Sequence, residues 1–155
     1  MKTLSRIILI IVLALSFNAC THNNGDIGDL FGTWKMQSIT IDGEIDTTYQ
    51  NNILWKFQAS VMNMNRANDE NHSRHEGWGS WKYANNETQI IVDFTHTDND
   101  HPNMGSDKYS PLPETYIPKA SISTLDIIEL NNSKLTLKYI SNDGTEYVYK
   151  FKRWA

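Results

Sequence analysis

The 155-residue chain has a single cysteine, Cys20, so no disulfide bond can form within it. A domain built from this chain must therefore be stable through its hydrophobic core alone. Alanine is scarce, whereas Trp, Tyr and Phe make up 11% of the residues, a composition that favours strands over helices. The net charge is −4 and no basic stripe occurs, which argues against nucleic acid as a partner.

The chain also lacks an apolar run long enough to span a bilayer. Its longest, Ile7–Leu15, has nine residues and follows the positively charged Lys2 and Arg6. Ser16-Phe17-Asn18-Ala19 then leads to Cys20, with the small Ala19 directly before it. This order of charged, apolar and small residues is that of a secretory signal, and it predicts a signal peptide at residues 1–19.

A cysteine directly after Ala19 resembles the lipobox of bacterial lipoproteins, in which the thiol is acylated and becomes the first mature residue. The resemblance implies lipidation of Cys20, attachment to a membrane through that lipid, and a place in the cell envelope, at the outer membrane of a Gram-negative bacterium. The other interpretation is an ordinary cleaved signal followed by a free, reactive thiol. Lipidation explains both the position of the cysteine and the lack of a second one.

Removal of residues 1–19 takes away two cations and no acid, so the net charge changes from −4 to −6. The 136 residues that remain are enough for one domain with a core and too few for two. Residues 20–29 are polar and contain glycine, as expected of a lipidated, flexible tether. We therefore expect a single domain at residues 30–155.

Period-two alternation of apolar and polar residues recurs in eight segments, and no segment has a convincing helical pattern. Short links such as Asn85-Asn86 require antiparallel neighbours. The sequence thus predicts an all-β fold, an eight-stranded antiparallel up-and-down barrel, in which closure removes the exposed edges. A two-sheet sandwich is the alternative. The predicted strands are 33–41, 53–58, 61–66, 77–83, 88–95, 122–130, 134–140 and 146–153.

Gly32 and Trp34 open the first strand as Gly-Thr-Trp, and Arg153 stands near the end of the last strand. This combination resembles the signature of lipocalins and related calycins, and the chain most resembles the lipocalin-like domains of small Bacteroidetes-type lipoproteins. The resemblance implies that Trp34 closes one end of the barrel and that Arg153 lies across its indole ring. A guanidinium stacked on an indole contributes about 0.5–2 kcal/mol. These three residues are expected to be structural.

Residues 97–120 contain all four prolines and carry no strand pattern. A connection of this length is unusual inside a compact domain and is often functional, such as a lid. A decorative or disordered insertion is the equal alternative.

Metal binding and catalysis are both disfavoured. The histidines and acids of two predicted loops lack the spacing of known metal motifs, and no metal or cofactor is expected. No Gly-x-Ser-x-Gly or phosphate-binding glycine loop occurs, and no candidate acid has an evident partner, so we expect no enzyme. The residues concerned are His72, His75, His96, His101, Asp98 and Asp100 for metal, and Glu76, Asp93, Asp126 and Glu129 for acid–base chemistry.

An eight-stranded barrel is just wide enough either to be filled by its own side chains or to hold one small molecule. We expect a small apolar or amphipathic ligand. The alternative is a solid barrel that serves as a scaffold and contacts protein or glycan through residues 97–120. Alternation is the same whichever face points inward, so no ligand-binding residue is assigned. The bulky residues that could line a cavity are Trp55, Phe57, Met62, Met64, Trp81, Tyr83, Tyr147 and Tyr149.

Overall fold

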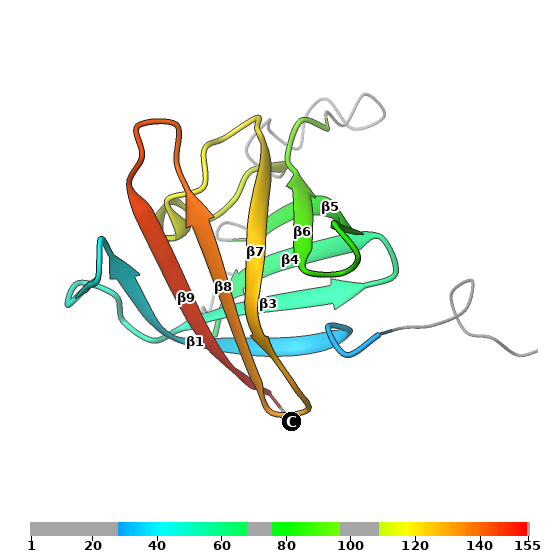
Figure 1. Cartoon of the computed structure of the whole chain (residues 1–155), viewed down its shortest axis with the longest axis horizontal. Helices are drawn as coiled ribbons and strands as arrows, with labels where there is room; N and C mark the ends of the chain where they lie inside the picture. Colours follow the sequence, from blue (N-terminus) through cyan, green and yellow to red (C-terminus); the bar gives the residue numbers. More distant parts are fainter. Residues whose placement is uncertain (1–27, 68–75, 97–108, 155) are drawn as a thin grey trace, which may run out of the picture.

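The fold is a closed antiparallel barrel. The computed structural model describes residues 28–67, 76–96 and 109–154. In that part of the chain nine strands form one sheet in the order β2-β1-β3-β4-β5-β6-β7-β8-β9, and β1 also pairs with β9 (Figure 1). This last pairing closes the ring, which confirms the eight-stranded up-and-down barrel and excludes the sandwich. The strands are β1 Gly32–Ile41, β2 Glu44–Ile45, β3 Ile53–Gln58, β4 Val61–Arg66, β5 Glu76–Ala84, β6 Gln89–Asp93, β7 Ile122–Leu130, β8 Lys134–Ile140 and β9 Glu146–Arg153.

The additional strand is β2, which lies outside the ring of eight. It pairs only with the end of β1, where Thr40 faces Ile45 and Ile41 faces Glu44. Asp42 and Gly43 form the turn between the two strands, both with positive φ, as hairpin turns of this kind require. Two residues are too few to produce a visible alternation, so the sequence carried no signal for β2. The other eight strands begin and end within two residues of their predicted bounds.

Strand β1 pairs with two neighbours of the ring, β3 and β9, and thereby closes it. Its first residues pair with β3, from Gly32 opposite Phe57 to Lys35 opposite Leu54. Its whole length from Trp34 onward pairs with β9, with a bulge between Met36 and Ser38. A bulge adds local twist, which lets one strand bend from one neighbour to the other.

Inward-facing side chains from all eight strands of the ring form one apolar core. In β3, for example, Trp55 and Phe57 are fully buried, whereas Gln58 is exposed. The backbone closure thus decides the question that alternation left open, namely which face of each strand is inside. The fully buried large side chains include Trp34, Met36, Ile39, Ile53, Trp55, Phe57, Met62, Met64, Ile90, Phe94 and Tyr149.

One end of the barrel is sealed by Trp34 under Arg153. The guanidinium carbon of Arg153 lies 4.2 Å from the centre of the Trp34 ring, and the two residues are cross-strand partners. The indole Nε1 of Trp34 donates to the carbonyl of Leu30 at 2.8 Å. Burial of the ring is complete, so this hydrogen bond satisfies the one polar group that the ring carries. We refer to this end as the closed end.

Arg153 also ties down the chain that leads into β1. Its Nη1 donates to the carbonyl of Phe31 at 2.7 Å and its Nη2 to that of Asp29 at 2.5 Å, while Nε donates to Asn132 at 2.8 Å. Gly32 has φ +121°, and a Cβ there would lie 2.8 Å from Nη1 of Arg153. Glycine is therefore required at this position both by its backbone angle and by the approach of the guanidinium.

We predict that Arg153→Ala lowers the free energy of unfolding by about 2–4 kcal/mol, because it removes three charged hydrogen bonds and the stacking on Trp34. Arg153→Lys keeps the charge without the planar fork, so an intermediate loss is expected. Urea denaturation measures both. Lys152→Ala, at the neighbouring exposed position, is the control and should change stability by less than about 0.5 kcal/mol. Equal stability of wild type and Arg153→Ala would contradict this account of the closed end.

Candidate functional site

The two ends of the barrel differ in kind. Gly32, Trp34 and Arg153 lie together at the closed end, in contacts that hold the barrel shut. Strand β3 begins and β4 ends at the opposite end, and there the structure has a cavity. We refer to this opposite end as the mouth.

Large side chains pack the interior between the two ends. The ring of Trp55 lies 4.9 Å from that of Phe151 and 5.6 Å from that of Tyr149, measured between centroids. Phe57 meets Trp81 edge-on at 5.3 Å. Six of the eight residues proposed to line a cavity are thus buried core, and the other two are partly buried. The six are Trp55, Phe57, Met62, Met64, Trp81 and Tyr149, and the two are Tyr83 and Tyr147.

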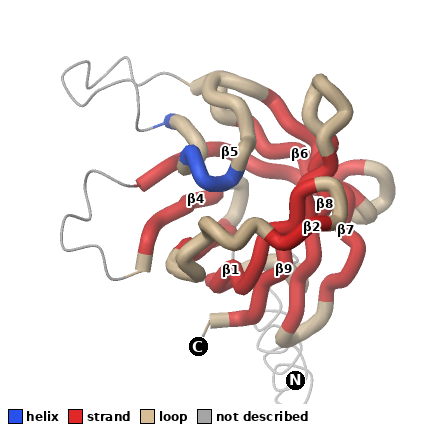
Figure 2. Tube along the Cα trace, turned by 90° about the vertical axis from the view of Figure 1, so that its left-hand side faces the viewer, coloured by secondary structure: helices blue, strands red, loops and turns tan. Residues whose placement is uncertain are grey.

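Residues 109–117 enter the mouth and cap the core, and we call this segment the plug. It contains the 3-10 helix η4 (Pro113–Thr115), which lies beside the ends of β4 and β5 (Figure 2). Thr115 is fully buried, and its carbonyl accepts a hydrogen bond of 2.6 Å from the hydroxyl of Tyr149. Leu112 and Ile117 are 4% exposed. Residues 109–120 thus contain no strand, as their sequence pattern indicated, but part of this segment packs against the core; residues 97–108 lie outside the described residues.

Two glycines on the inner face of β5 make room for neighbouring groups, Gly77 for the plug and Gly79 for Phe94. A Cβ on Gly77 would overlap the carbonyl oxygen of Ser110, which is part of the plug's backbone. A Cβ on Gly79 would lie 2.8 Å from the ring of Phe94. Both positions point inward, opposite Met64 and Met62 of β4. A side chain at position 77 would therefore exclude the plug, whereas one at position 79 would displace the ring of Phe94.

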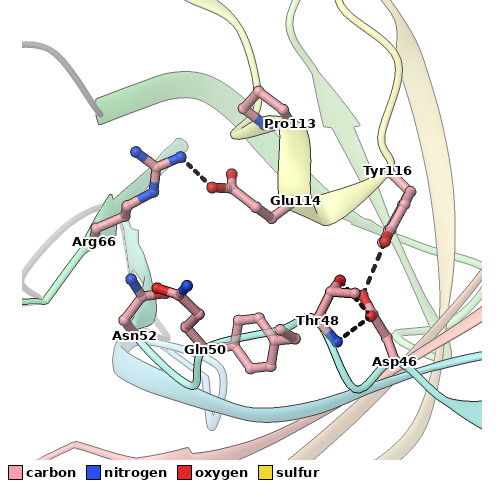
Figure 3. Close-up of a pocket in the computed structure, with 9 residues that line it drawn as sticks. Asp46, Thr48, Gln50, Asn52, Arg66, Pro113, Glu114 and Tyr116 are labelled. Atoms are coloured by element: carbon pink, nitrogen blue, oxygen red, sulfur yellow. Dashed lines mark hydrogen bonds and ion pairs between the residues drawn. The ribbon is translucent and has the colours of Figure 1, made fainter.

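Between the plug and the loop that joins β2 to β3 lies a cavity of about 460 Å³ (Figure 3). Its walls come from three separate parts of the chain, which only the closed barrel brings together. Polar side chains dominate the wall, with aromatic rings and a proline between them. The lining residues are Asp46, Thr48, Tyr49, Gln50, Asn52, Arg66, Pro113, Glu114 and Tyr116.

Two interactions join the barrel wall to the plug across this cavity. Arg66, the last residue of β4, forms an ion pair with Glu114 of η4. On the other side, the hydroxyl of Tyr116 donates to Oδ2 of Asp46 at 2.9 Å. Figure 3 shows these pairs on opposite sides of the cavity, with Gln50 between them. The plug is therefore held at both of its flanks by polar contacts that water can reach.

These contacts also set the charge of the mouth. Hydrogen bonding from Thr48 lowers the pKa of the Asp46 carboxyl below its usual value. The hydrogen bond to that carboxylate raises the pKa of Tyr116, and burial raises the pKa of Tyr49 to about 12. At neutral pH the cavity therefore presents an ionised Asp46 beside two protonated phenols, of which Tyr116 donates to Asp46 and Tyr49 donates to the carbonyl of Met36.

Tyr116 also extends an aromatic stack into the mouth. Its ring stacks on Tyr147 at 5.0 Å, and Tyr147 stacks on Tyr139 at 5.9 Å. The residue has φ 58°, a left-handed backbone conformation that is uncommon outside glycine. The stack and the bond to Asp46 hold Tyr116 in this conformation, with its ring 37% exposed at the cavity wall.

The acids considered for catalysis do not converge. Each accepts a hydrogen bond from a different neighbour on the outer face or in a loop, and none lines the mouth cavity. The donors are Asn63 to Glu76, Thr95 to Asp93, Gln89 to Asp126 and Asn131 to Glu129.

Of the residues considered for metal binding, only His96 is described, and it contacts Ser80 Oγ at 3.1 Å. His72, His75, His101, Asp98 and Asp100 lie outside the described residues. Within residues 28–67, 76–96 and 109–154, no three His, Cys, Asp or Glu residues lie close enough to hold a metal ion. The same ranges contain no helix that is both long and apolar enough to cross a membrane. Cys20 and residues 1–19 also fall outside them.

Sequence reasoning assigned none of the residues that line the mouth cavity. Its charged residues Asp46, Arg66 and Glu114 stand in no motif and are 20 and 48 positions apart. The one available signal was the proline-rich segment at 97–120, which contains Pro113 and Glu114. No sequence pattern pairs that segment with the β2–β3 loop.

A family model and one crystal structure support this fold. A sequence profile for the lipocalin-like domain matches residues 13–152. No curated protein sequence matches significantly. The crystal structure of a lipocalin-like protein from Bacteroides uniformis is similar, with a TM-score of 0.54 and 17% identity over 82% of this chain and 100% of that one. Two bovine odorant-binding protein structures, a deswapped triple mutant and a complex with its natural ligand, have TM-scores of 0.41 and 0.43 at 9% identity, over 82% and 87% of this chain and 75% and 77% of theirs.

We predict that Gly77→Ala displaces the plug, because the new methyl group overlaps the Ser110 carbonyl. Overpacking of this kind costs about 1–3 kcal/mol. Hydrogen exchange should quicken at the amides of Thr115 and Tyr116, which now bond to Leu112 and Pro113 within the plug. Ser80→Ala, at an outward position of the same strand, is the control. Unchanged exchange in Gly77→Ala would show that the plug does not depend on this glycine.

Proposed function

The chain belongs to the lipocalin-like domain family, and from the geometry of its barrel we propose that it binds a small amphipathic molecule at the mouth, without catalysis. The observation that carries this proposal is the 460 Å³ cavity at the end opposite Trp34. Its volume lies in the range of about 300–1,000 Å³ that small-molecule sites occupy. Barrels of this size in the family hold one small ligand.

The lining supports an amphipathic guest better than a wholly apolar one. Gln50 and Asn52 supply amide donors and acceptors, and Arg66 and Glu114 supply charge. The rings of Tyr49 and Tyr116 offer apolar surface with a polar tip. A ligand with an apolar body and a few hydrogen-bonding groups would match both the tyrosine rings and the polar side chains of this wall.

The core beneath the plug offers further donors. The indole N–H groups of Trp55 and Trp81 are buried and have no hydrogen-bond acceptor among the residues that the structure describes. Buried indoles usually find one, because an unsatisfied donor costs about 1–3 kcal/mol. A guest whose acceptor atom passes the plug would satisfy them, so the same ligand could occupy the mouth or extend inward.

A solid scaffold is the second candidate function, and the packed interior favours it. In that case the exposed surface of the plug and the rest of residues 97–120 would contact a protein or a glycan. The two candidates differ in one respect: only the carrier requires an occupied mouth cavity.

We predict that the protein purified from its own host carries a bound small molecule detectable by native mass spectrometry. Gln50→Trp should fill the mouth cavity, because the indole would occupy the space that the ligand needs. The fraction of protein with bound ligand should fall at least about tenfold. Gln50 is exposed, so the unfolding free energy should change by less than about 0.5 kcal/mol. Gln58→Trp, exposed at the other end of β3, is the matched control.

A protein that is free of small molecules in its native mass spectrum, or one in which Gln50→Trp leaves the bound fraction unchanged, would reject the mouth as the site. The first result would favour the scaffold. The second would place the ligand elsewhere in the barrel, for which Gly77→Ala provides the next test.

We further propose that residues 1–19 are a lipoprotein signal, that residues 20–29 are a tether, and that Cys20 carries the lipid anchor of an envelope protein at the outer membrane of a Gram-negative bacterium. The support is the order of residues at the N-terminus and the solitary cysteine. Cells fed labelled palmitate should incorporate it into the wild-type chain, and Cys20→Ser should abolish that incorporation. Label retained in the variant would refute the anchor.

A further inference from the structure

Four lysines gather on the outer face of the barrel near its closed end, and we call them the lysine face. Lys152 of β9 stands directly opposite Lys35 of β1 on one side and Lys134 of β8 on the other. Lys150 is two positions along β9 on the same face. Directly opposed residues have Cα atoms about 4.5–5.5 Å apart, and like charges at such positions are destabilising.

Counter-charges for these lysines are scarce in the part of the chain that the structure describes. None of the four forms an ion pair there, whereas Lys138, on the outer face of β8 nearer the mouth, pairs with Asp126 and Glu146. Glu129, which lies beside these lysines, accepts a hydrogen bond from Asn131. A surface hollow of about 440 Å³ is lined by Glu129 together with Lys134, Lys150 and Lys152.

This concentration is not a consequence of overall charge, because the chain as a whole is acidic, at −4. The fold brings the lysines together, because the pairing of β1 with β9 places Lys35 beside Lys152, although the two are 117 positions apart. A row of like charges that costs stability is retained where an anionic partner offsets it.

The lysine face lies near the closed end, where the chain enters the barrel, and this position indicates what the lysines contact. The chain enters the barrel at the closed end, where Arg153 holds the carbonyls of Asp29 and Phe31. Cys20 precedes Asp29 by nine residues, which span at most about 30 Å when fully extended. A lipid on Cys20 would therefore keep the closed end, and with it the lysine face, close to the bilayer.

We propose that the lysine face docks on the anionic phospholipid headgroups of the membrane that holds the acylated Cys20. This inference rests on the proposed anchor. Each lysine near an anionic surface contributes an attraction of about fivefold in binding, and lysine heads can reach the headgroups while their stems lie along the strands. The lysines would thus add an electrostatic attraction to the attachment that the lipid supplies.

The docked barrel would lie with β1, β9 and β8 toward the bilayer. The mouth is at the other end of these strands, where β1 ends and β9 begins, so the cavity would stay open to solution. Trp154, 48% exposed and 5.2 Å from the ammonium of Lys35, lies at the same end and would sit at the headgroup level that tryptophan favours.

The test uses the acylated protein from its own host, reconstituted into vesicles of phosphatidylcholine alone or of phosphatidylcholine mixed with phosphatidylglycerol. Amine acetylation is followed lysine by lysine with mass spectrometry. We expect the four lysines to react about fivefold more slowly in the anionic vesicles, and high salt to remove this protection. Lys138 is the internal control, and its rate should be the same in both vesicles.

The results distinguish failure of the proposed lipid anchor from failure of the proposed docking of the lysine face. Protein that floats with neither vesicle lacks the anchor, and both proposals fail. Protein that floats with both vesicles but shows equal lysine rates keeps the anchor and overturns docking. Protection by inorganic phosphate without vesicles would assign the lysine face to a soluble anion, which also overturns membrane docking.

A variant separates docking from a role in folding. In the triple variant Lys134→Gln, Lys150→Gln, Lys152→Gln, the remaining Lys35 should lose its protection in anionic vesicles while flotation persists through the lipid. Its denaturation midpoint should stay the same or rise, because the like-charge row is gone. A lower midpoint together with retained protection of Lys35 would show that these lysines stabilise the fold and do not dock.

Discussion

The pairing of β1 with β9 is the constraint on which the rest of this structure depends. It turns an eight-stranded sheet into a ring without edges, and it sets Trp34 opposite Arg153. The guanidinium then seals the closed end by stacking on the indole and by bonding to carbonyls of the entering chain. Without closure neither contact would exist, since the two residues are 119 positions apart in the chain.

Closure also dictates how the interior is used. A ring of eight strands has little internal space, and here aromatic side chains and the plug occupy it. Gly77 provides the room for the plug, and Tyr149 binds the carbonyl of Thr115 from below. The space that remains for a ligand lies at the mouth, where most of the lining side chains are polar. This arrangement accounts for a proposed ligand with amphipathic character within a family whose barrels hold small molecules.

Two surfaces at opposite ends of the barrel follow from the same closure. The mouth is held together by contacts of the plug with the end of β4, through Glu114 and Arg66, and with the β2–β3 loop, through Tyr116 and Asp46. The lysine face is held by strands, with Lys152 between two like charges. Ligand contact at one end and membrane contact at the other would not compete, because strands β1 and β9 run from one to the other.

The sequence by itself determined the eight antiparallel strands, to within two residues, because period-two alternation and turn residues are local signals; it predicted a barrel, and the pairing of β1 with β9 then excluded the sandwich. It also placed Trp34 and Arg153 through a resemblance at the two chain ends. Only the tertiary structure decided which strand faces point inward, that residues 109–117 plug the mouth, and that Asp46, Arg66 and Glu114 line one cavity. The physical reason is that these relations are made by pairings between distant segments, whose register no local pattern encodes.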